Sequence, residues 1–154
     1  MSGKRVHESR VTLNQLMLPE HANPMGSVHG GNIMKLVDET GGLCAMRHAR
    51  RPVVTVAMDS MTFHSPVQVG DMLMLDANMT WTGSSSMEVE VMVKTENLIS
   101  GEQTHTNTAY LVYVALDDNG KTTAVPPLIV ETSEEQRRWQ EARARQRRRL
   151  ERQR

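Results

Sequence analysis

The 154-residue chain has one cysteine, few aromatic residues and no long hydrophobic run. A single cysteine, Cys44, excludes an internal disulfide and any zinc site built from clustered cysteines, and it fits a reducing compartment. Five aromatic residues leave little for stacking bases, so no nucleic-acid partner is expected. No apolar run approaches the length needed to cross a bilayer, and the first residues lack the apolar region of a signal peptide. These absences predict a cytoplasmic protein without membrane insertion.

Charge is balanced over the whole chain but unevenly distributed along it. Residues 133–154 contain nine arginines and four glutamates, whereas the preceding part is acidic overall. A basic tail on an acidic body either binds a phosphate-bearing partner or is an ordinary solvated helix, and composition leaves both interpretations open. The length is that of one domain. We therefore expect a single domain over residues 1–132, followed by a basic C-terminal helix over residues 133–154.

Apolar periodicity predicts one long helix and five strands. A helical pattern follows a Gly-rich loop at residues 33–46, and strand patterns occupy residues 8–17, 53–64, 72–82, 87–95 and 104–116. Turn residues separate the last four strands, which favours antiparallel pairing. The C-terminal helix is expected to use Ser133 as its N-cap and Gln136 in a capping box. One helix against a curved antiparallel sheet of five or six strands is an α+β architecture.

The predicted long helix carries a carboxylate, Asp38, at the border of its apolar arc. Nearby, Gly41 and Gly42 each cost about 1 kcal/mol relative to alanine inside a helix, so the close approach of another group is expected there. Asp38 is either a solvated border residue, free or paired with Lys35, or a residue with a chemical role. Its spacing alone does not decide between these interpretations.

The loop before this helix helps to decide between the two interpretations of Asp38. Gly30 and Gly31 stand at the expected start of the helix, where backbone N–H groups have no intrahelical acceptor. These groups and the helix dipole suit a polarised carbonyl or a developing oxyanion. Together with Asp38 and the upstream amide of Asn23, they favour a site for acyl transfer or hydrolysis.

Several residues occur in a specific order: Asn23, Gly26, Gly30, Gly31 and Asp38. The segments VVTVAMDSMTFHSPVQVGD and TGSSSMEVEV follow them. In this order they resemble the hotdog-fold acyl-CoA thioesterases of the cytosolic acyl-CoA hydrolase type, which include the bacterial YciA-like enzymes. The resemblance extends over about residues 8–116. It implies that a curved sheet wraps one central helix, and that homodimers assemble into a hexamer, a trimer of dimers.

The resemblance also implies catalytic roles. Asp38 matches the catalytic acid of the family, which acts as a general base on water or as a nucleophile. Asn23 of the opposite subunit would orient the water or the thioester. Thr55 would assist the carboxylate, although an ordinary strand threonine is the alternative. The Gly31 N–H would polarise the thioester carbonyl.

The turn TGSSSM matches the coenzyme A segment of the family, although a polar hairpin turn explains it equally. The residues expected to contact coenzyme A are Gly30, Ser84, Ser85, Ser86 and Met87. The remaining candidates are expected to be structural; they are His29, His64 and His105. No metal and no separate cofactor is implied, because water, a carboxylate and an oxyanion site suffice, and coenzyme A is part of the substrate.

The implied function is hydrolysis of acyl-CoA thioesters to free coenzyme A and a carboxylic acid. A non-catalytic acyl-CoA sensor is the alternative from another class, with the basic tail touching nucleic acid, but no helix-turn-helix pattern supports it. A hotdog dehydratase or hydratase is a third interpretation. Such chemistry would need a His–acid pair, and the helix offers Asp38 without a matched histidine.

Overall fold

A computed structural model describes residues 1–59 and 61–152. The elements follow one another in the order β1 (Lys4–Arg5), η1 (Val6–Glu8), β2 (Val11–Leu16), η2 (Pro19–His21), α1 (Gly30–Ala49), β3 (Val53–Met58), β4 (Asp71–Thr82), β5 (Ser86–Asn97), β6 (Gln103–Ala115), β7 (Leu128–Ile129) and α2 (Ser133–Arg152). Within these residues, no helix combines the length and the hydropathy that crossing a membrane requires.

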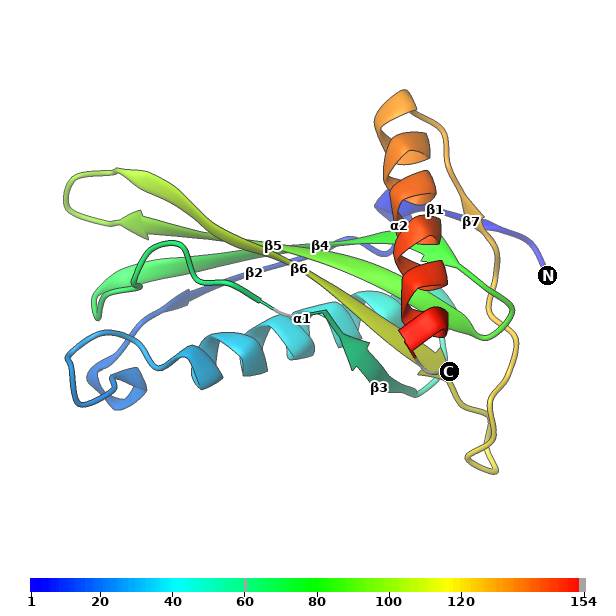
Figure 1. Ribbon diagram of the computed structural model, residues 1–154, viewed down its shortest axis with the longest axis horizontal. Coiled ribbons are helices and arrows are strands. Elements are labelled where there is room, and N and C mark those ends of the chain that lie inside the picture. The colour runs from blue at the N-terminus through cyan, green and yellow to red at the C-terminus, as the bar shows by residue number, and fades with distance from the viewer. Residues whose placement is uncertain (60, 153–154) are drawn as a thin grey trace.

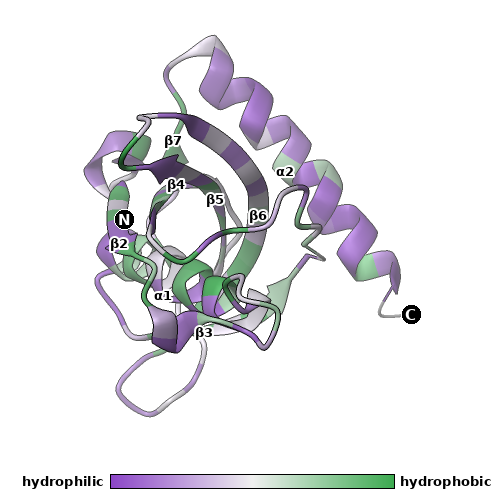
Figure 2. Cartoon of the chain, turned by 90° about the vertical axis from the view of Figure 1, so that its left-hand side faces the viewer, coloured by the Kyte–Doolittle hydropathy of each residue, from purple (hydrophilic) through white to green (hydrophobic). Residues whose placement is uncertain are grey.

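The main sheet is antiparallel and curves around α1 (Figures 1 and 2). Its five strands lie in the order β2-β4-β5-β6-β3, so β2 and β3 are the edges. A separate parallel pair joins β1 to β7. The predicted α+β hotdog architecture, with one central helix, five strands and a C-terminal helix, is confirmed.

Strand alternation explains why the sheet wraps the helix. Alternate residues of β5 (Met87, Val89, Val91 and Val93) have no exposed surface, and they lie in one core with Ile33, Val37 and Cys44 of α1. A sheet with one apolar face must cover that face, and the amphipathic α1 does so. The helix ends where Arg50 adopts a left-handed conformation (φ 54°), two residues before Pro52. Cys44 is inert in this core, because burial raises its thiol pKa to about 12.

The structure differs from the sequence prediction at several element ends. The first long strand begins at Val11, because Val6–Glu8 form a 3₁₀ turn. β3 ends at Met58, well before the expected residue 64, and residue 60 of that expected strand lies outside the described residues. Beyond β3, the Asn107 side-chain amide donates to the Thr62 carbonyl (2.6 Å). A side chain thus satisfies this carbonyl where a strand partner was expected.

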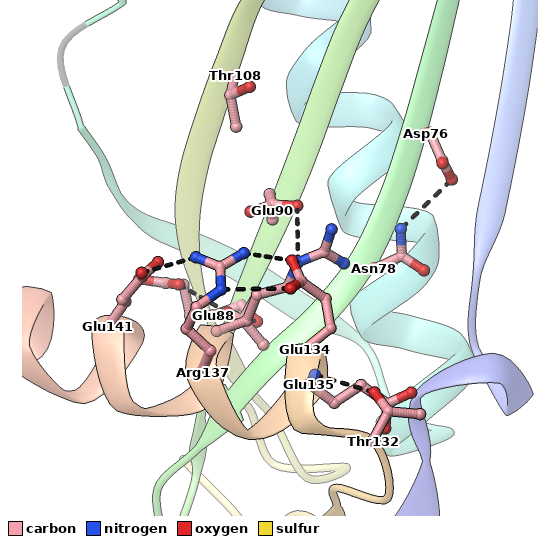
Figure 3. Close-up of polar contacts among 12 residues, drawn as sticks. Asp76, Asn78, Glu88, Glu90, Thr108, Thr132, Glu134, Glu135, Arg137 and Glu141 are labelled. Atoms are coloured by element: carbon pink, nitrogen blue, oxygen red, sulfur yellow. Dashed lines mark hydrogen bonds and ion pairs between the residues drawn. The ribbon is translucent and has the colours of Figure 1, made fainter.

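The cap of α2 lies one residue earlier than expected. Thr132 Oγ1 accepts a hydrogen bond from the Glu135 N–H (3.0 Å) (Figure 3). Glu135 Oε1 in turn accepts one from the Glu131 N–H (3.0 Å). The prediction of Ser133 as N-cap with Gln136 was therefore wrong. A carboxylate at this position suits the positive end of the helix dipole better than the neutral Gln136 does.

The C-terminal helix α2 lies across the outer, convex face of the sheet at one of its ends (Figure 1). Its inward side is polar: Arg138, Arg145 and Arg149 face acidic residues of the sheet around a buried Ala142. The basic tail is therefore not simply solvated. The expected division of the chain after residue 132 stays a prediction.

Candidate active site

Asp38 lies on the side of α1 that faces β3 and β6, and its side chain is half-buried. Thr55 of β3 donates from Oγ1 to Asp38 Oδ1 (2.8 Å). The Tyr113 hydroxyl of β6 lies 3.0 Å from the same oxygen and 2.9 Å from the Asp38 carbonyl. Among the described residues, the side-chain donors to the Asp38 carboxylate are Thr55 and Tyr113, and both contact Oδ1. These two contacts fix the carboxylate and leave Oδ2 for other partners.

Tyr113 was not predicted from the sequence. Tyr113 is 1% exposed, and this burial is the main reason why the pKa of its phenol is raised. The nearby Asp38 carboxylate raises this pKa further. The hydroxyl consequently stays protonated and remains a hydrogen-bond donor to Asp38. The signal for it lay in the helix, where an unexplained glycine pair indicated the approach of another group.

Gly41 is the glycine that Tyr113 requires. A Cβ built on Gly41 would lie 2.5 Å from the Tyr113 hydroxyl oxygen, much closer than real Cβ contacts allow. A Cβ on Gly42 would meet Tyr113 only at 3.7 Å, an ordinary van der Waals distance. The expected close approach is thus confirmed at Gly41, whereas the structure gives no such reason for Gly42.

Thr55 faces Asp38 from an edge strand. β3 pairs with β6 on one side, in a register that sets Thr55 opposite Tyr113. The two donors therefore come from neighbouring positions on one sheet face and converge on one helical carboxylate. Local strand and helix patterns do not specify which residues of β3 and β6 pair. The sequence therefore indicated Thr55 only through the family resemblance.

The expected oxyanion glycines begin α1, but one of them is already engaged. His29 caps the helix, and its Nδ1 accepts a hydrogen bond from the Gly31 N–H (3.0 Å). The Phe63 ring packs on the start of the helix, where a Cβ on Gly30 would meet it at 3.4 Å. His29 is exposed, so its ring is free to move off the Gly31 N–H. His29 thus serves as a capping residue of the loop, in line with the expectation that it is structural.

Asn23 lies in the loop before α1 and is not brought to Asp38 within one chain. Its Nδ2 donates to Ser27 Oγ (3.2 Å), and its Oδ1 accepts from the Met25 N–H (2.9 Å). The helix places Asp38 about 12 Å along its axis from Gly30, at about 1.5 Å of rise per residue. One chain therefore supplies Asp38 with Thr55 and Tyr113, but not with Asn23.

The expected coenzyme A turn lies at the sheet end where β3 begins. The Ser85 carbonyl accepts from the Ala115 N–H (3.1 Å), and Ala115 pairs with Val53, two residues before Thr55. Ser84 is exposed, and Ser85 and Ser86 are half-buried, so their hydroxyls are accessible to a ligand. The Met87 side chain is fully buried in the core. Any contact of Met87 with a ligand is consequently limited to its backbone.

The two remaining candidate histidines are His64 and His105. His105 Nε2 lies 2.9 Å from Thr108 Oγ1, and His64 is exposed. Within residues 1–59 and 61–152, no group of three or more His, Cys, Asp or Glu side chains is arranged to hold a metal ion.

Sequence comparisons identify relatives over most of the chain. A family model described as the thioesterase superfamily matches residues 25–101. A Bacillus subtilis protein, described as the uncharacterized acyl-CoA thioester hydrolase YkhA, is 41% identical over 83% of this chain and 74% of its own length. Rat cytosolic acyl coenzyme A thioester hydrolase is 35% identical over 91% of this chain. The chain spans only 37% of the length of that mammalian relative.

Solved structures of acyl-CoA thioesterases and hydrolases are also similar to this chain, both in fold and in sequence. A crystal structure of an apo-hexameric acyl-CoA thioesterase has a TM-score of 0.94 and 40% identity, and the match covers 99% of this chain and 97% of that one. The Staphylococcus aureus acyl-CoA hydrolase, solved with butyryl coenzyme A, coenzyme A and coenzyme A disulfide, has a TM-score of 0.90 and 34% identity, over 97% and 92% of the two chains.

Structures of three alanine variants of the S. aureus enzyme are also similar to this chain; they replace an Asn, an Asp and a Thr. Those residues have the same order and spacing as Asn23, Asp38 and Thr55. The family model, the relatives and the fold therefore agree, and the chain belongs to the thioesterase superfamily as a member of the hotdog-fold acyl-CoA thioesterases.

Proposed function

We propose that this chain hydrolyses acyl-CoA thioesters to free coenzyme A and a carboxylic acid, with Asp38 as the reacting carboxylate. The observation that carries the proposal is the orientation of Asp38 by two donors, Thr55 and Tyr113, at a half-buried position of the central helix. A solvated border residue would not need a buried tyrosine and a glycine slot to hold it. Lys35, the partner considered in the alternative interpretation, is exposed on the same helix.

Both donors occupy Oδ1, so Oδ2 is the oxygen that reacts. As a general base it takes a proton from water while the water oxygen attacks the thioester carbon. As a nucleophile it attacks that carbon directly, and water later cleaves the resulting anhydride. In both routes an oxyanion forms, the C–S bond then breaks, and the coenzyme A sulfur leaves and takes up a proton. The geometry of one chain is compatible with either route.

The oxyanion donor is proposed to be the Gly31 N–H at the start of α1. This group is engaged by His29 Nδ1, so the substrate carbonyl must displace the imidazole. The displacement costs little, because one acceptor replaces another at the same N–H and the His29 side chain is exposed. The helix dipole adds to the stabilisation of the oxyanion.

The site is proposed to be shared between two copies of the chain. Asn23 lies in the loop before α1 and Gly31 in the first turn of α1, whereas Asp38 of the same chain lies about 10 Å along the helix from Gly31. A thioester held by one subunit's loop is therefore better placed to meet Asp38 of the partner. The sheet edge β3, beside Asp38, supports this, because edge strands are natural pairing sites.

Exposed apolar side chains surround that edge. Val54 and Val56 of β3 are 44% and 55% exposed, and Leu43 and Met46 of α1, each more than 40% exposed, line one groove with Val53 of β3. Apolar side chains gathered on one exposed surface mark an interaction surface. We propose that two copies pair here and that such dimers assemble into a hexamer, a trimer of dimers.

Coenzyme A is proposed to contact Gly30 and the hydroxyls of Ser84, Ser85 and Ser86, with only backbone from Met87. No metal or separate cofactor enters the proposed chemistry, and a cytoplasmic location remains part of the proposal. The oriented carboxylate favours an enzyme over a sensor, because a binding module has no need for it.

Thiol release from acyl-CoAs of increasing chain length tests this function. We expect steady release of coenzyme A, followed with a thiol reagent, for at least one chain length. The single protein thiol is buried and protonated, so it adds no background. Saturable binding of these esters without any thiol release would contradict the proposal and favour the sensor.

A further inference from the structure

The edge strand β3 contains a bulge that turns its two ends toward opposite faces of the sheet. Thr55 pairs with Tyr113, but Ala57 pairs with Val112, so Val56 is the extra residue. Before the bulge, Thr55 faces α1 and bonds to Asp38. After it, the Asp59 N–H donates to the Tyr110 carbonyl (3.0 Å), and the Asp59 side chain lies on the outer face. Without the extra residue, side chains two and four positions after Thr55 would share its face.

On the outer face, Asp59 meets an arginine of the C-terminal helix. Arg149 Nε lies 3.2 Å from Asp59 Oδ1, and Arg149 Nη2 lies 3.1 Å from Asp59 Oδ2. Such a two-point contact fixes direction as well as distance. The bond therefore ties α2 to the end of β3, just beyond the bulge.

Arg149 is itself held by a buried carboxylate of the sheet. Its Nη2 lies 2.7 Å from Glu88 Oε2, and the Glu88 side chain has no exposed surface. Arg145 donates to both Glu88 oxygens (2.8 and 3.0 Å) and stacks on the Tyr110 ring at 3.6 Å from its centroid. Glu88 and Glu90 lie between β5 and α2 (Figure 3). The arginine that contacts β3 is thus immobilised against the middle of the sheet.

A purely stabilising role explains this cluster poorly. Buried ion pairs often contribute no more to stability than apolar side chains of the same size would, because their charges must be desolvated. Their best-attested use, shown in some proteins, is to specify one arrangement or register among several. The arrangement in need of specification here is the register of β3, an edge strand with one partner in the chain. A one-residue slip would remove Thr55 from the face of Asp38.

We infer that Asp59 and Arg149 are positioning residues: they hold the bulge of β3 in register from the outer face, and so keep Thr55 on Asp38 at the inner face. The inference rests on the proposed function, in which Asp38 reacts and Thr55 orients it. The C-terminal helix is then a part of the catalytic scaffold, although it does not touch the site.

The main test is Asp59→Asn, which keeps the size of the side chain and removes the ion pair. Amide hydrogen exchange across residues 53–59 should become about tenfold faster, as expected when a bond to a charged group is lost locally, while β4 and β5 keep their protection. Turnover should fall by about tenfold at nearly constant KM, well within the roughly 100-fold that a 1 Å misplacement can cost. Arg149→Gln should do the same from the helix side.

Arg138→Gln is the matched control. Arg138 lies on the same face of α2, but it pairs with Glu90 of β5 (3.9 Å) and with Glu134 of its own helix, not with β3. This variant should keep wild-type exchange in β3 and wild-type turnover. If it lowers both as Asp59→Asn does, α2 acts through general stability and the inference is wrong.

A double-mutant cycle with Thr55→Ala tests the route through Thr55. In that background Asp59→Asn should cost almost no further turnover, because the side chain that it positions is gone. An equal loss in both backgrounds, or unchanged exchange in β3, would overturn the inference. Failure of the proposed function would give a different result, because Asp38→Asn would then retain turnover. The hydrogen-exchange measurement would still test whether Asp59 holds β3 in place.

Discussion

Asp38→Asn is expected to reduce kcat by roughly 10²–10⁴-fold, the usual contribution of a positioned acid or base. Asparagine has nearly the same shape, and its carbonyl oxygen still accepts hydrogen bonds from Thr55 and Tyr113, so the site should keep its geometry. The change removes the negative charge and the basicity of the reacting oxygen. Thiol release at saturating acyl-CoA measures the effect.

The affinity for substrate separates this loss from a binding defect. Because the apolar surface and the Gly31 N–H remain, acyl-CoA affinity should change by no more than a few-fold. Glu39→Gln is the matched control: it neutralises an exposed carboxylate one residue away on the same helix, and it should leave kcat unchanged. Near-normal turnover in folded Asp38→Asn would make Asp38 a border residue without a chemical role.

Gly41→Ala is expected to lower kcat by roughly 10- to 100-fold, since a misplacement of about 1 Å at a catalytic group can cost this much. The new methyl group would lie 2.5 Å from the Tyr113 hydroxyl oxygen, so the phenol must move away from Asp38. Stability should change less than activity. The strain of overpacking, typically about 1–3 kcal/mol, is partly offset by the better helix propensity of alanine, about 1 kcal/mol.

Gly42→Ala is the control for this effect. Its Cβ would meet Tyr113 at 3.7 Å, so alanine should fit, and the variant should be as active as the wild type and slightly more stable. Tyr113→Phe removes only the hydroxyl, and it should reproduce most of the loss seen in Gly41→Ala. Thermal unfolding and thiol release of the three variants measure both quantities. Equal activity of Gly41→Ala and Gly42→Ala would contradict the role assigned to Tyr113.

The architecture could be predicted because binary patterns dominate it. Alternation in β4 and β5 and the apolar arc of the helix each specify a face, and one sheet around one helix is the economical way to cover both. Element ends were less predictable. Thr132 and Ser133 are both good caps, and the choice between them depends on which glutamate or glutamine folds back.

The candidate site was predictable only in part, because the sequence pattern does not specify the register in which the strands pair. The helix showed an acid and two glycines, but the partner of Gly41 is Tyr113, far away in sequence, and the pairing of β6 with β3 decides which side chain arrives there. Thr55 was indicated by resemblance, not by its pattern.

The burial of charged residues on the outer face of the sheet was not predictable either, for a different reason. The alternating pattern of β5 places Glu88 and Glu90 on the face of the sheet opposite the core, and such a face is ordinarily exposed to solvent. The structure buries both, at 0% and 6% exposure, under the arginines of α2. Charge composition identified the tail as basic, but no local pattern connected its arginines with two glutamates of one strand. Pairing between distant charges is a tertiary property.

The central claim is that one subunit's Asp38 works with the partner subunit's Asn23. Its most direct test is to mix inactive Asn23→Ala and Asp38→Ala proteins under conditions where subunits exchange, and then to measure thiol release. In a two-fold dimer, random exchange yields heterodimers with one intact site, so about a quarter of wild-type activity should return. A mixture of Asp38→Ala with Asp38→Asn should recover none. If exchange is demonstrated and the first mixture is no more active than its parents, the shared site is refuted.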